Sequence, residues 1–363
     1  MPRDLHRKPF NEGTLLKLDL FRKYIDAWLA VFVGSGRITK KKIRIFDFFC
    51  GPGQDSNGQK GSPFLILEAL QCLAAMIKHV GYEVDVYFND ADADKVTGLK
   101  QTLTDASLMD GPYTPHFSSE DFIDAFKKLR PEMLDSANLL LLDQNGVRFF
   151  TADIFYQIRT LPVTDTLVFM SASYVLRFKD EPEINRYLEA ERIFAGKTPA
   201  YHQVHRAIVD YYRSLVPKSA QYLLAPFSIR SGSNIHGLIF GSQNHKGLQK
   251  FLETAWNLDK LRGEADYDID REGILESEPS LFPGMDKPKK TKLFELRLEK
   301  ELLAGRLSDT GAIYSYVLEQ GFLMKHAMPV LRRLVKERRI DGNTSHIEYS
   351  SIRKPEPIKV NRK

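Results

Sequence analysis

Residues 44–55, RIFDFFCGPGQD, place an aspartate, a cysteine and two glycines at the end of a short apolar run. The run reads as a fully buried parallel strand, because its side chains leave no polar face. Glycines directly after such a strand let the backbone pass close to a ligand, since no Cβ stands in the way. The pattern therefore predicts a ligand site at the end of this strand, around Asp47, Gly51 and Gly53.

Acidic residues also end two further predicted strands, with Asp90 after VDVYFN and Asp143 after ANLLLL. An acid after the second strand is placed to bind a ribose diol, and Asp121 after the third strand is placed to reach an adenine amine. The turn lacks Lys and Arg and matches neither glycine-rich phosphate-binding pattern. These charges suit a cationic sulfonium better than a pyrophosphate. We therefore expect S-adenosylmethionine, bound by Asp47, Phe49, Cys50, Gly51, Gly53, Asp90 and Asp121.

Strands and helices alternate along the chain in the way that would position these residues. We expect strands at 43–49, 84–90, 113–119, 137–143, 165–176, 221–230 and 236–242, with helices at 15–33, 62–81, 92–106, 122–130, 151–161 and 181–215. Five strand–helix units predict a parallel sheet covered by helices, and the last two strands form a hairpin that adds an antiparallel strand. The expected fold is α/β, a doubly wound, mostly parallel seven-stranded Rossmann-like sheet with a C-terminal winged helix.

The bulk composition fits a globular protein of two domains, with 43% hydrophobic and 27% charged residues in 363. The apolar stretch 15–33 carries five charges, so we expect an amphipathic helix and no membrane contact. The first ten residues do not resemble a signal peptide. With only Cys50 and Cys72, the chain is expected in the cytoplasm without a structural metal.

Positive charge is concentrated near the C-terminus, where residues 286–363 carry 18 Lys and Arg against 10 Asp and Glu. Three short helical segments and a hairpin near Asp341-Gly342-Asn343 predict a winged helix, with Ala327, Leu331, Leu334 and Val335 on the core face of its third helix. Its basic side chains suggest DNA or RNA as a partner. A solvated basic face, or a protein-binding winged helix, stays open as an alternative. The predicted contacts are Lys325, Arg332, Arg333, Lys336 and Arg339.

Four stretches resemble the bacterial three-Cys-motif partner protein family, within the class I S-adenosylmethionine-dependent methyltransferases: KYIDAWLAVF, FDFFCGPGQDSNGQKGSPFLILEAL, VYFNDAD and APFSIRSGSNIHGLIFGSQNHKGLQKFLETAW. The resemblance implies a methyltransferase domain and a partner protein with three cysteines. We expect a helical extension at 1–40, a Rossmann-like domain at 41–275, a linker at 276–292 and a winged helix with a basic tail at 293–363.

The loop after the fourth strand departs from the family pattern, because Asp143-Gln144-Asn145-Gly146 stands where Asp-Pro, an aromatic residue and Gly are expected. In that loop the acid orients an exocyclic amine toward the methyl group. The catalytic residues would then be Asp143 and Asn145, acting on a base nitrogen of nucleic acid. The alternative is a catalytically inactive cofactor-binding or DNA-binding subunit, serving a radical-type enzyme or a phage-defence system.

Several of these residues have simpler interpretations. Asp47 could cap the turn through its side chain, and Cys50 fits a small neighbour of the cofactor better than a nucleophile. His202 and His205 share a helix face without a third metal ligand, so we expect no metal there. Arg177 lines a substrate path or pairs with Asp180.

Overall fold

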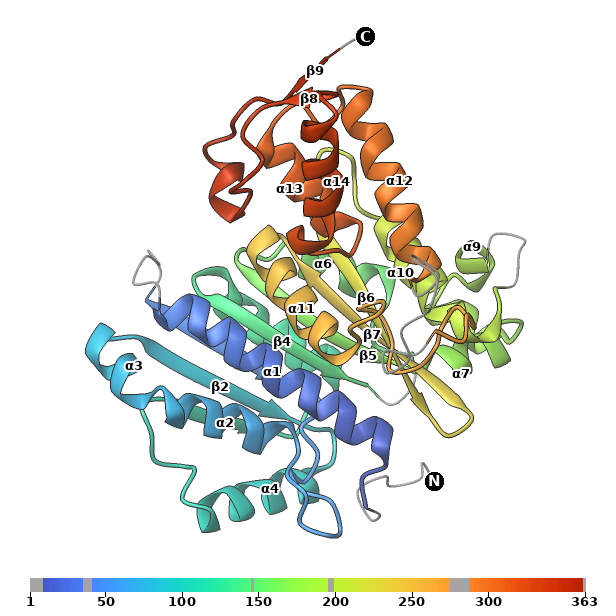
Figure 1. Cartoon of the computed structure of the whole chain (residues 1–363). Coiled ribbons are helices and arrows are strands. Elements are labelled where there is room, and N and C mark those ends of the chain that lie inside the picture. Colours follow the sequence, from blue (N-terminus) through green and yellow to red (C-terminus); the bar gives the residue numbers. More distant parts are fainter. Residues whose placement is uncertain (1–8, 35–40, 145–146, 195–198, 275–286, 362–363) are drawn as a thin grey trace. The chain divides into compact units, whose positions relative to one another are not determined.

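The computed structural model describes residues 9–34, 41–144, 147–194, 199–274 and 287–361, and it divides into two compact units, Met1–Gln243 and Asn244–Lys363. Seven strands form the sheet of the first unit (Figure 1): β1 Lys42–Asp47, β2 Glu83–Asn89, β3 Thr114–Ser118, β4 Ala137–Asp143, β5 Thr164–Met170, β6 Leu223–Ser231 and β7 Asn234–Ser242. The domain boundaries expected from the sequence stay a prediction.

The strand order is β3-β2-β1-β4-β5-β7-β6. The first five strands pair in parallel, and β7 runs antiparallel to both β5 and β6. The predicted α/β fold with a mostly parallel seven-stranded sheet is confirmed. Because the order reverses between β1 and β4, the ends of these two strands border the crevice where doubly wound sheets bind ligands.

Burial explains why β1 and β4 occupy the centre of the sheet. Ile43, Ile45 and Phe46 in β1 have no exposed surface, and Leu139 and Leu140 in β4 have none either. Strands that are covered on both faces need such continuous apolar runs. The polar residues at their ends, where the apolar cover stops, are therefore available for a site.

The helices of the first unit differ in places from those expected. They are α1 Glu12–Gly34, α2 Ser62–Cys72, α3 Ala74–Val80, α4 Ala93–Asp105, α5 Phe122–Leu129, α6 Ala152–Arg159, α7 Ala172–Arg177, α8 Pro182–Tyr187, α9 Ala190–Phe194 and α10 Val204–Ser214. The helix expected at 62–81 is broken at Leu73, and the strand expected at 165–176 ends at Met170 before α7. The helix expected at 181–215 is three helices: α8 begins at Pro182, a residue favoured in the first helical turn, and Pro199, which lies between α9 and α10, cannot continue a helix.

Helix α1 packs against α2 and β6 with one apolar side, as its amphipathic pattern predicts. Phe21, Ile25 and Trp28 are almost fully buried. The Tyr24 hydroxyl donates a 2.7 Å hydrogen bond to Asp165 in β5. Burial raises the pKa of Asp165 to about 6, although the hydrogen bonds from Ser242 and Tyr24 act in the opposite direction. This polar contact fixes the rotation of α1 on the sheet.

No single helix of the described ranges is long and apolar enough to cross a membrane. Helices α2 and α3 pass the length and composition test only when taken together, across a 61° bend.

The second unit contains four helices of eight or more residues within its described ranges: α11 His245–Leu258, α12 Lys289–Leu303, α13 Thr310–Glu319 and α14 Met324–Lys336. Two short strands, β8 Ile340–Asp341 and β9 Lys359–Val360, pair in antiparallel fashion. The strands of the hairpin expected near 341–343 do pair, but their connection is long, because residues 342–358 lie between them and include the 3-10 turn Tyr349–Ile352. Val335, expected in the core, is 37% exposed.

We expect Tyr24→Phe to lower the free energy of unfolding by about 1–2 kcal/mol, because the buried Asp165 carboxyl loses a donor. Urea unfolding followed by circular dichroism measures the change. Tyr156→Phe is the control, since Tyr156 is 56% exposed and should have little effect. Equal stability of the two variants would contradict the role given to Tyr24.

Candidate functional site

The turn that follows β1, residues 50–53, is called the glycine turn here and is held against the end of β2 by hydrogen bonds. The Cys50 amide donates to the Asn89 carbonyl at 3.0 Å, and the Gly51 amide donates to the Asp90 carboxylate at 3.1 Å. Gly51 and Gly53 have φ values of 58° and 80°, a region that disfavours residues with a Cβ. The two adjacent strand ends therefore form one structure in which Asp90 orders the turn.

The insert between the turn and α2 closes on itself. Gln54 and Lys60 form an antiparallel bridge, and the Gly61 amide donates to the Gly53 carbonyl at 2.7 Å. The buried Asp55 carboxylate accepts from the amides of Asn57 and Gln59. The insert is therefore a side loop, and the start of α2 lies directly beside the glycine turn despite the residues between them in sequence.

Asp47 ends β1 with 1% of its surface exposed. The Ser62 hydroxyl at the start of α2 donates to its carboxylate at 2.7 Å, and the Phe49 amide donates at 3.4 Å. Burial raises the pKa of Asp47 to about 7, and the charges of Asp143 and Asp90 act in the same direction. Asp47 does bond to the turn, as its simpler interpretation has it, and the burial of its carboxyl group favours the protonated form in spite of these two hydrogen bonds.

An aromatic cluster lies beside the turn. The ring centroids of Phe49 and Phe122 are 5.3 Å apart, and Phe149 lies 5.4 Å from Phe49 and 5.5 Å from Phe122. Asp121, directly before Phe122, is exposed and accepts from the Ile123 amide at 3.0 Å as the cap of α5. Phe49 and Phe149 are only partly buried, so the cluster offers apolar surface next to an exposed carboxylate.

Asp143 at the end of β4 forms an ion pair with Lys17 of α1, whose side chain is 9% exposed. The Lys17 ammonium also lies 4.6 Å from the ring centroid of Phe169 in β5. The sequence analysis missed this partner, although a lysine on the buried face of an amphipathic helix was the available signal. Asp143 therefore keeps only part of its acceptor capacity for a substrate.

The loop after Asp143 is only partly described, and Asn145, one of the two predicted catalytic residues, lies outside the described residues. Gln144 is 2% exposed. Its side-chain oxygen accepts from the amides of Phe149 and Phe150 at 2.8 and 3.3 Å. The Gln144 carbonyl thus shapes the loop, while its buried amide nitrogen has no hydrogen-bond partner in the part of the chain that the structure describes.

Cys50 is buried and free, and its burial raises the pKa of the thiol well above the usual value. This fits a small neighbour of a ligand better than a nucleophile. Within the described ranges, no group of three or more His, Cys, Asp or Glu side chains is arranged to bind a metal. Asp180 forms its ion pair with Lys179, at 3.5 Å.

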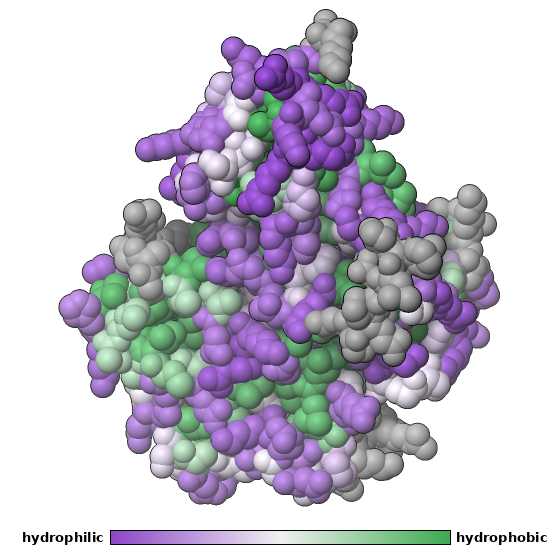
Figure 2. All heavy atoms as spheres, viewed as in Figure 1, coloured by the Kyte–Doolittle hydropathy of each residue, from purple (hydrophilic) through white to green (hydrophobic). Residues whose placement is uncertain are grey.

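The five cations predicted to contact nucleic acid are not equivalent. Arg333 and Arg339 form ion pairs with Glu299 of α12, at 2.5 and 2.6 Å. Arg332 and Lys336 are exposed, and within the described residues they form no ion pair. Figure 2 shows a mainly hydrophilic surface over the three helices α12–α14. Lys325, at the start of α14, is exposed too and forms no ion pair among the described residues.

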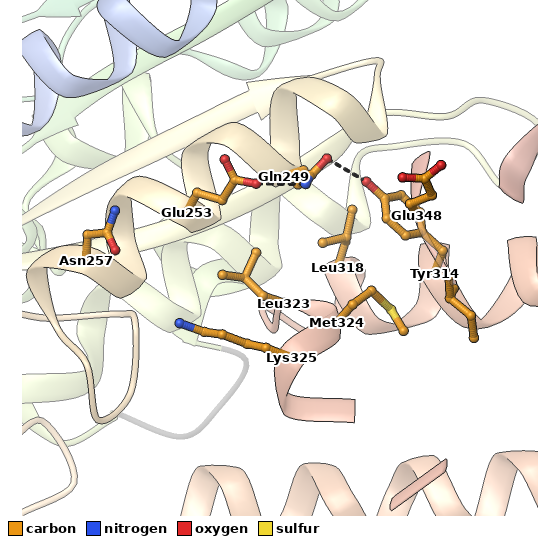
Figure 3. Close-up of a pocket in the computed structure, with 10 residues that line it drawn as sticks. Gln249, Glu253, Asn257, Tyr314, Leu318, Leu323, Met324, Lys325 and Glu348 are labelled. Carbon is orange, nitrogen blue, oxygen red and sulfur yellow. Dashed lines mark hydrogen bonds between the residues drawn. The ribbon is translucent and has the colours of Figure 1, made fainter. Parts of the chain in front are cut away.

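The first turn of α14 faces α11 of the same unit. The Trp256 indole of α11 donates to the Gly321 carbonyl at 3.0 Å and lies 4.0 Å from the His326 ring. A groove of about 450 Å³ runs beside this contact. Figure 3 shows Gln249, Glu253 and Asn257 of α11 along one edge and Lys325 along the other. Lys325 thus lines a groove within the unit.

The comparisons with known proteins give limited matches. No protein-family model matches the chain, and no curated protein matches it. A SAM-dependent methyltransferase from Agrobacterium tumefaciens aligns at a TM-score of 0.33 and 13% identity, over 59% of this chain and 58% of that chain. A geranyl diphosphate methyltransferase in complex with SAM aligns at a TM-score of 0.24 and 12% identity, over 60% and 85% of the respective chains. Likeness at this level identifies neither a family nor an activity.

The glycine turn offers a matched pair of substitutions. Gly53 and Gly58 have similar φ values of 80° and 76°, but a Cβ at Gly53 would lie 2.4 Å from the buried Leu99 side chain, whereas one at Gly58 meets nothing within 4 Å. We expect Gly53→Ala to destabilise the protein by about 1–3 kcal/mol more than Gly58→Ala, because only the former overpacks the core. Urea unfolding measures both, and equal losses would refute the close packing of the turn.

Proposed function

We propose that the first unit is an S-adenosylmethionine-dependent methyltransferase. The observation that carries this is the meeting of the glycine turn, Asp47 and Asp90 with Asp143 at the ends of β1, β2 and β4, where the strand order reverses. Residues 45–59 contain no Lys or Arg, which favours a cationic ligand over a phosphate. The chain's resemblance to class I methyltransferases supports the same assignment.

The residues present fit this cofactor. The Asp90 carboxylate is half-buried, and each of its oxygens accepts one backbone amide, which leaves lone pairs for a ribose diol. The rings of Phe49, Phe122 and Phe149 offer an apolar surface for the adenine, with Asp121 as acceptor for its amine. Gly51 and Gly53 leave the backbone open to close approach. When bound, S-adenosylmethionine supplies a methyl group on a positively charged sulfur.

The role proposed for Asp143 is to accept a hydrogen bond from the substrate amine and fix its orientation. Placement is the main demand on such a site, because proximity and orientation supply much of the rate. Lys17 holds the carboxylate in place from α1. Gln144 shapes the following loop through the amides of Phe149 and Phe150. Asn145 is proposed to bond the edge of the base.

Titration calorimetry with S-adenosylmethionine tests the cofactor site. We expect Asp90→Asn to weaken binding at least tenfold, which corresponds to about 1.4 kcal/mol, because it removes a charge and an acceptor beside the turn. Asp105→Asn, at an exposed position on α4, should bind like the wild type.

A cation bound beside Asp47 would lower the pKa of Asp47 from about 7, so binding of S-adenosylmethionine at pH 7 should release protons. If the wild type shows no detectable binding of S-adenosylmethionine, the proposed methyltransferase function is refuted.

We further propose that the substrate is nucleic acid, methylated at a base nitrogen. Three helices followed by two paired short strands occur in the order of a winged helix, and the family resemblance supports that identification. The net charge of +8 over residues 286–363 favours a polyanion. Of the predicted contacts, Lys325, Arg332 and Lys336 are the exposed cations of α14 that Glu299 does not compensate, and the last two lie on the second half of the helix.

Replacing both Arg332 and Lys336 by Ala should weaken binding to mixed DNA and RNA oligonucleotides and reduce the slope of log affinity against log salt by about 1–2. Fluorescence anisotropy over a salt series measures both effects. The double variant Lys100→Ala and Lys127→Ala loses the same charge from exposed positions of the first unit and should keep the wild-type slope. If both double variants behave alike, general charge rather than α14 binds the polyanion.

An inactive partner subunit is the second candidate function. The observation that favours it is the loop after β4, in which Gln144 is buried and Asp143 is already paired with Lys17. In this case the chain would bind the cofactor in the cytoplasm and serve a three-cysteine radical-type enzyme or a phage-defence assembly. A stable complex with that enzyme, together with cofactor binding but no methyl transfer to mixed nucleic acids, would favour this function.

A further inference from the structure

Four side chains from four elements meet at the ends of β4 and β5. Lys17 of α1 pairs with Asp143 of β4 and lies over the ring of Phe169 in β5. The His236 ring of β7 stacks on the same Phe169 ring, with centroids 5.0 Å apart and planes 16° apart. Asp143 and Phe169 are partners in the β4–β5 register. One side of the sheet thus carries a carboxylate, an ammonium and an imidazole around a single aromatic ring.

His236 has an acceptor or donor site that the fold does not use. Its ring nitrogen Nδ1 is buried and has no hydrogen-bond partner among the described residues. Buried polar atoms without partners are uncommon in folded proteins and call for a specific explanation. A substrate group that bonds to Nδ1 would supply one, and the adjacent Asp143 is the residue proposed to orient that substrate.

The surroundings of His236 favour its neutral form. Burial lowers its pKa below the usual value, the positive charge of Lys17 lowers it further, and the negative charge of Asp143 acts in the opposite direction. In the register between β6 and β7, Ile229 of β6 is the partner of His236. Gly237, the residue after His236, faces the opposite side of the sheet, and His205 of α10 packs against it there. A neutral imidazole can accept a proton at neutral pH.

We propose that His236 accepts the proton of the substrate nucleophile through Nδ1, and that Lys17 is a positioning residue that holds Asp143 beside this imidazole. The inference rests on the proposed methyl transfer and specifies its substrate as a neutral amine. As the amine nitrogen bonds to the methyl carbon, the carbon–sulfur bond breaks with its electron pair on sulfur. The N–H proton moves to Nδ1, and the imidazolium then loses it to water.

Histidine NMR titration of the protein without ligands tests the electrostatic part of this inference. The His236 signal, identified by its absence in His236→Gln, should titrate below 6.5. Lys17→Met should raise this pKa by about one unit, because it removes a cation and leaves Asp143 unpaired. Lys17→Arg should leave it near the wild-type value, and Asp143→Asn should lower it. A His236 pKa at or above 6.5, or one that Lys17→Met does not raise, overturns the inference.

Methyl transfer from labelled S-adenosylmethionine to mixed DNA and RNA tests the catalytic part. His236→Gln and His236→Asn should each lower turnover by a factor on the order of 10² or more while cofactor affinity measured by calorimetry stays unchanged. His116→Gln, at a partly buried histidine paired with Asp85, is the control and should keep wild-type turnover. The acidic limb of the pH–rate profile should move to higher pH in Lys17→Met. Wild-type turnover in either His236 variant overturns the inference, whereas absent cofactor binding by the wild type refutes the proposed function.

Discussion

The burial of Lys17 beside Asp143 is the constraint on which the candidate site depends. A buried ammonium group is costly unless a carboxylate compensates it, so α1 has to hold its lysine at the end of β4. Burial of the apolar face of α1 holds the helix on the sheet, and the hydrogen bond from Tyr24 to Asp165 fixes the rotation of the helix about its axis. An N-terminal helix that precedes the first strand thereby contributes a charged group to the site.

In the second unit, α11 and α12 both pack against the segment that leads into α14. The Trp256 indole bonds to the Gly321 carbonyl, and Lys290 lies 5.3 Å from the Phe322 ring while pairing with the buried Glu264 at 2.9 Å. These contacts hold the segment that leads into α14, and the His326 ring in the first turn of α14 packs on Trp256 as well. The exposed cations of α14 that have no ion pair among the described residues are Lys325, at its start, and Arg332 and Lys336, on its second half.

The sequence predicted the parts of the site that follow from local patterns. Asp47, Asp90 and Asp143 end strands whose apolar runs are visible in the sequence, and parallel strands bring their ends to one edge. The closure of the 54–61 insert was not predictable, because it depends on the bridge between Gln54 and Lys60 and on bonds to Asp55.

Lys17 and His236 escaped prediction for a different reason, which is that each acts on residues far away in the sequence. The sequence places Lys17 on the apolar face of its helix, but it does not show that the partner there is Asp143, 126 residues further along the chain. Likewise, His236 becomes informative only when β7 pairs with β5 and places its ring on Phe169. For Arg333 and Arg339 the local pattern was misleading. Their regular spacing with other basic residues predicted a free basic surface, whereas both pair with Glu299 of α12.

The charges of the first unit differ between the two sides of the β1–β4 crevice. This difference determines which side suits the methyl donor of the proposed reaction and which side suits the acceptor. At β1 and β2, Asp47 and Asp90 stand beside a turn without Lys or Arg, and burial leaves Asp47 ready to ionise fully when a cation arrives. At β4 and β7, Lys17 already balances Asp143, and His236 is held neutral. A positively charged donor is favoured on the first side and a neutral acceptor on the second. Transfer of a methyl group from a positively charged donor to a neutral amine leaves one proton to be removed. The Nδ1 atom of His236, which has no hydrogen-bond partner among the described residues, lies on the side where that proton would be released.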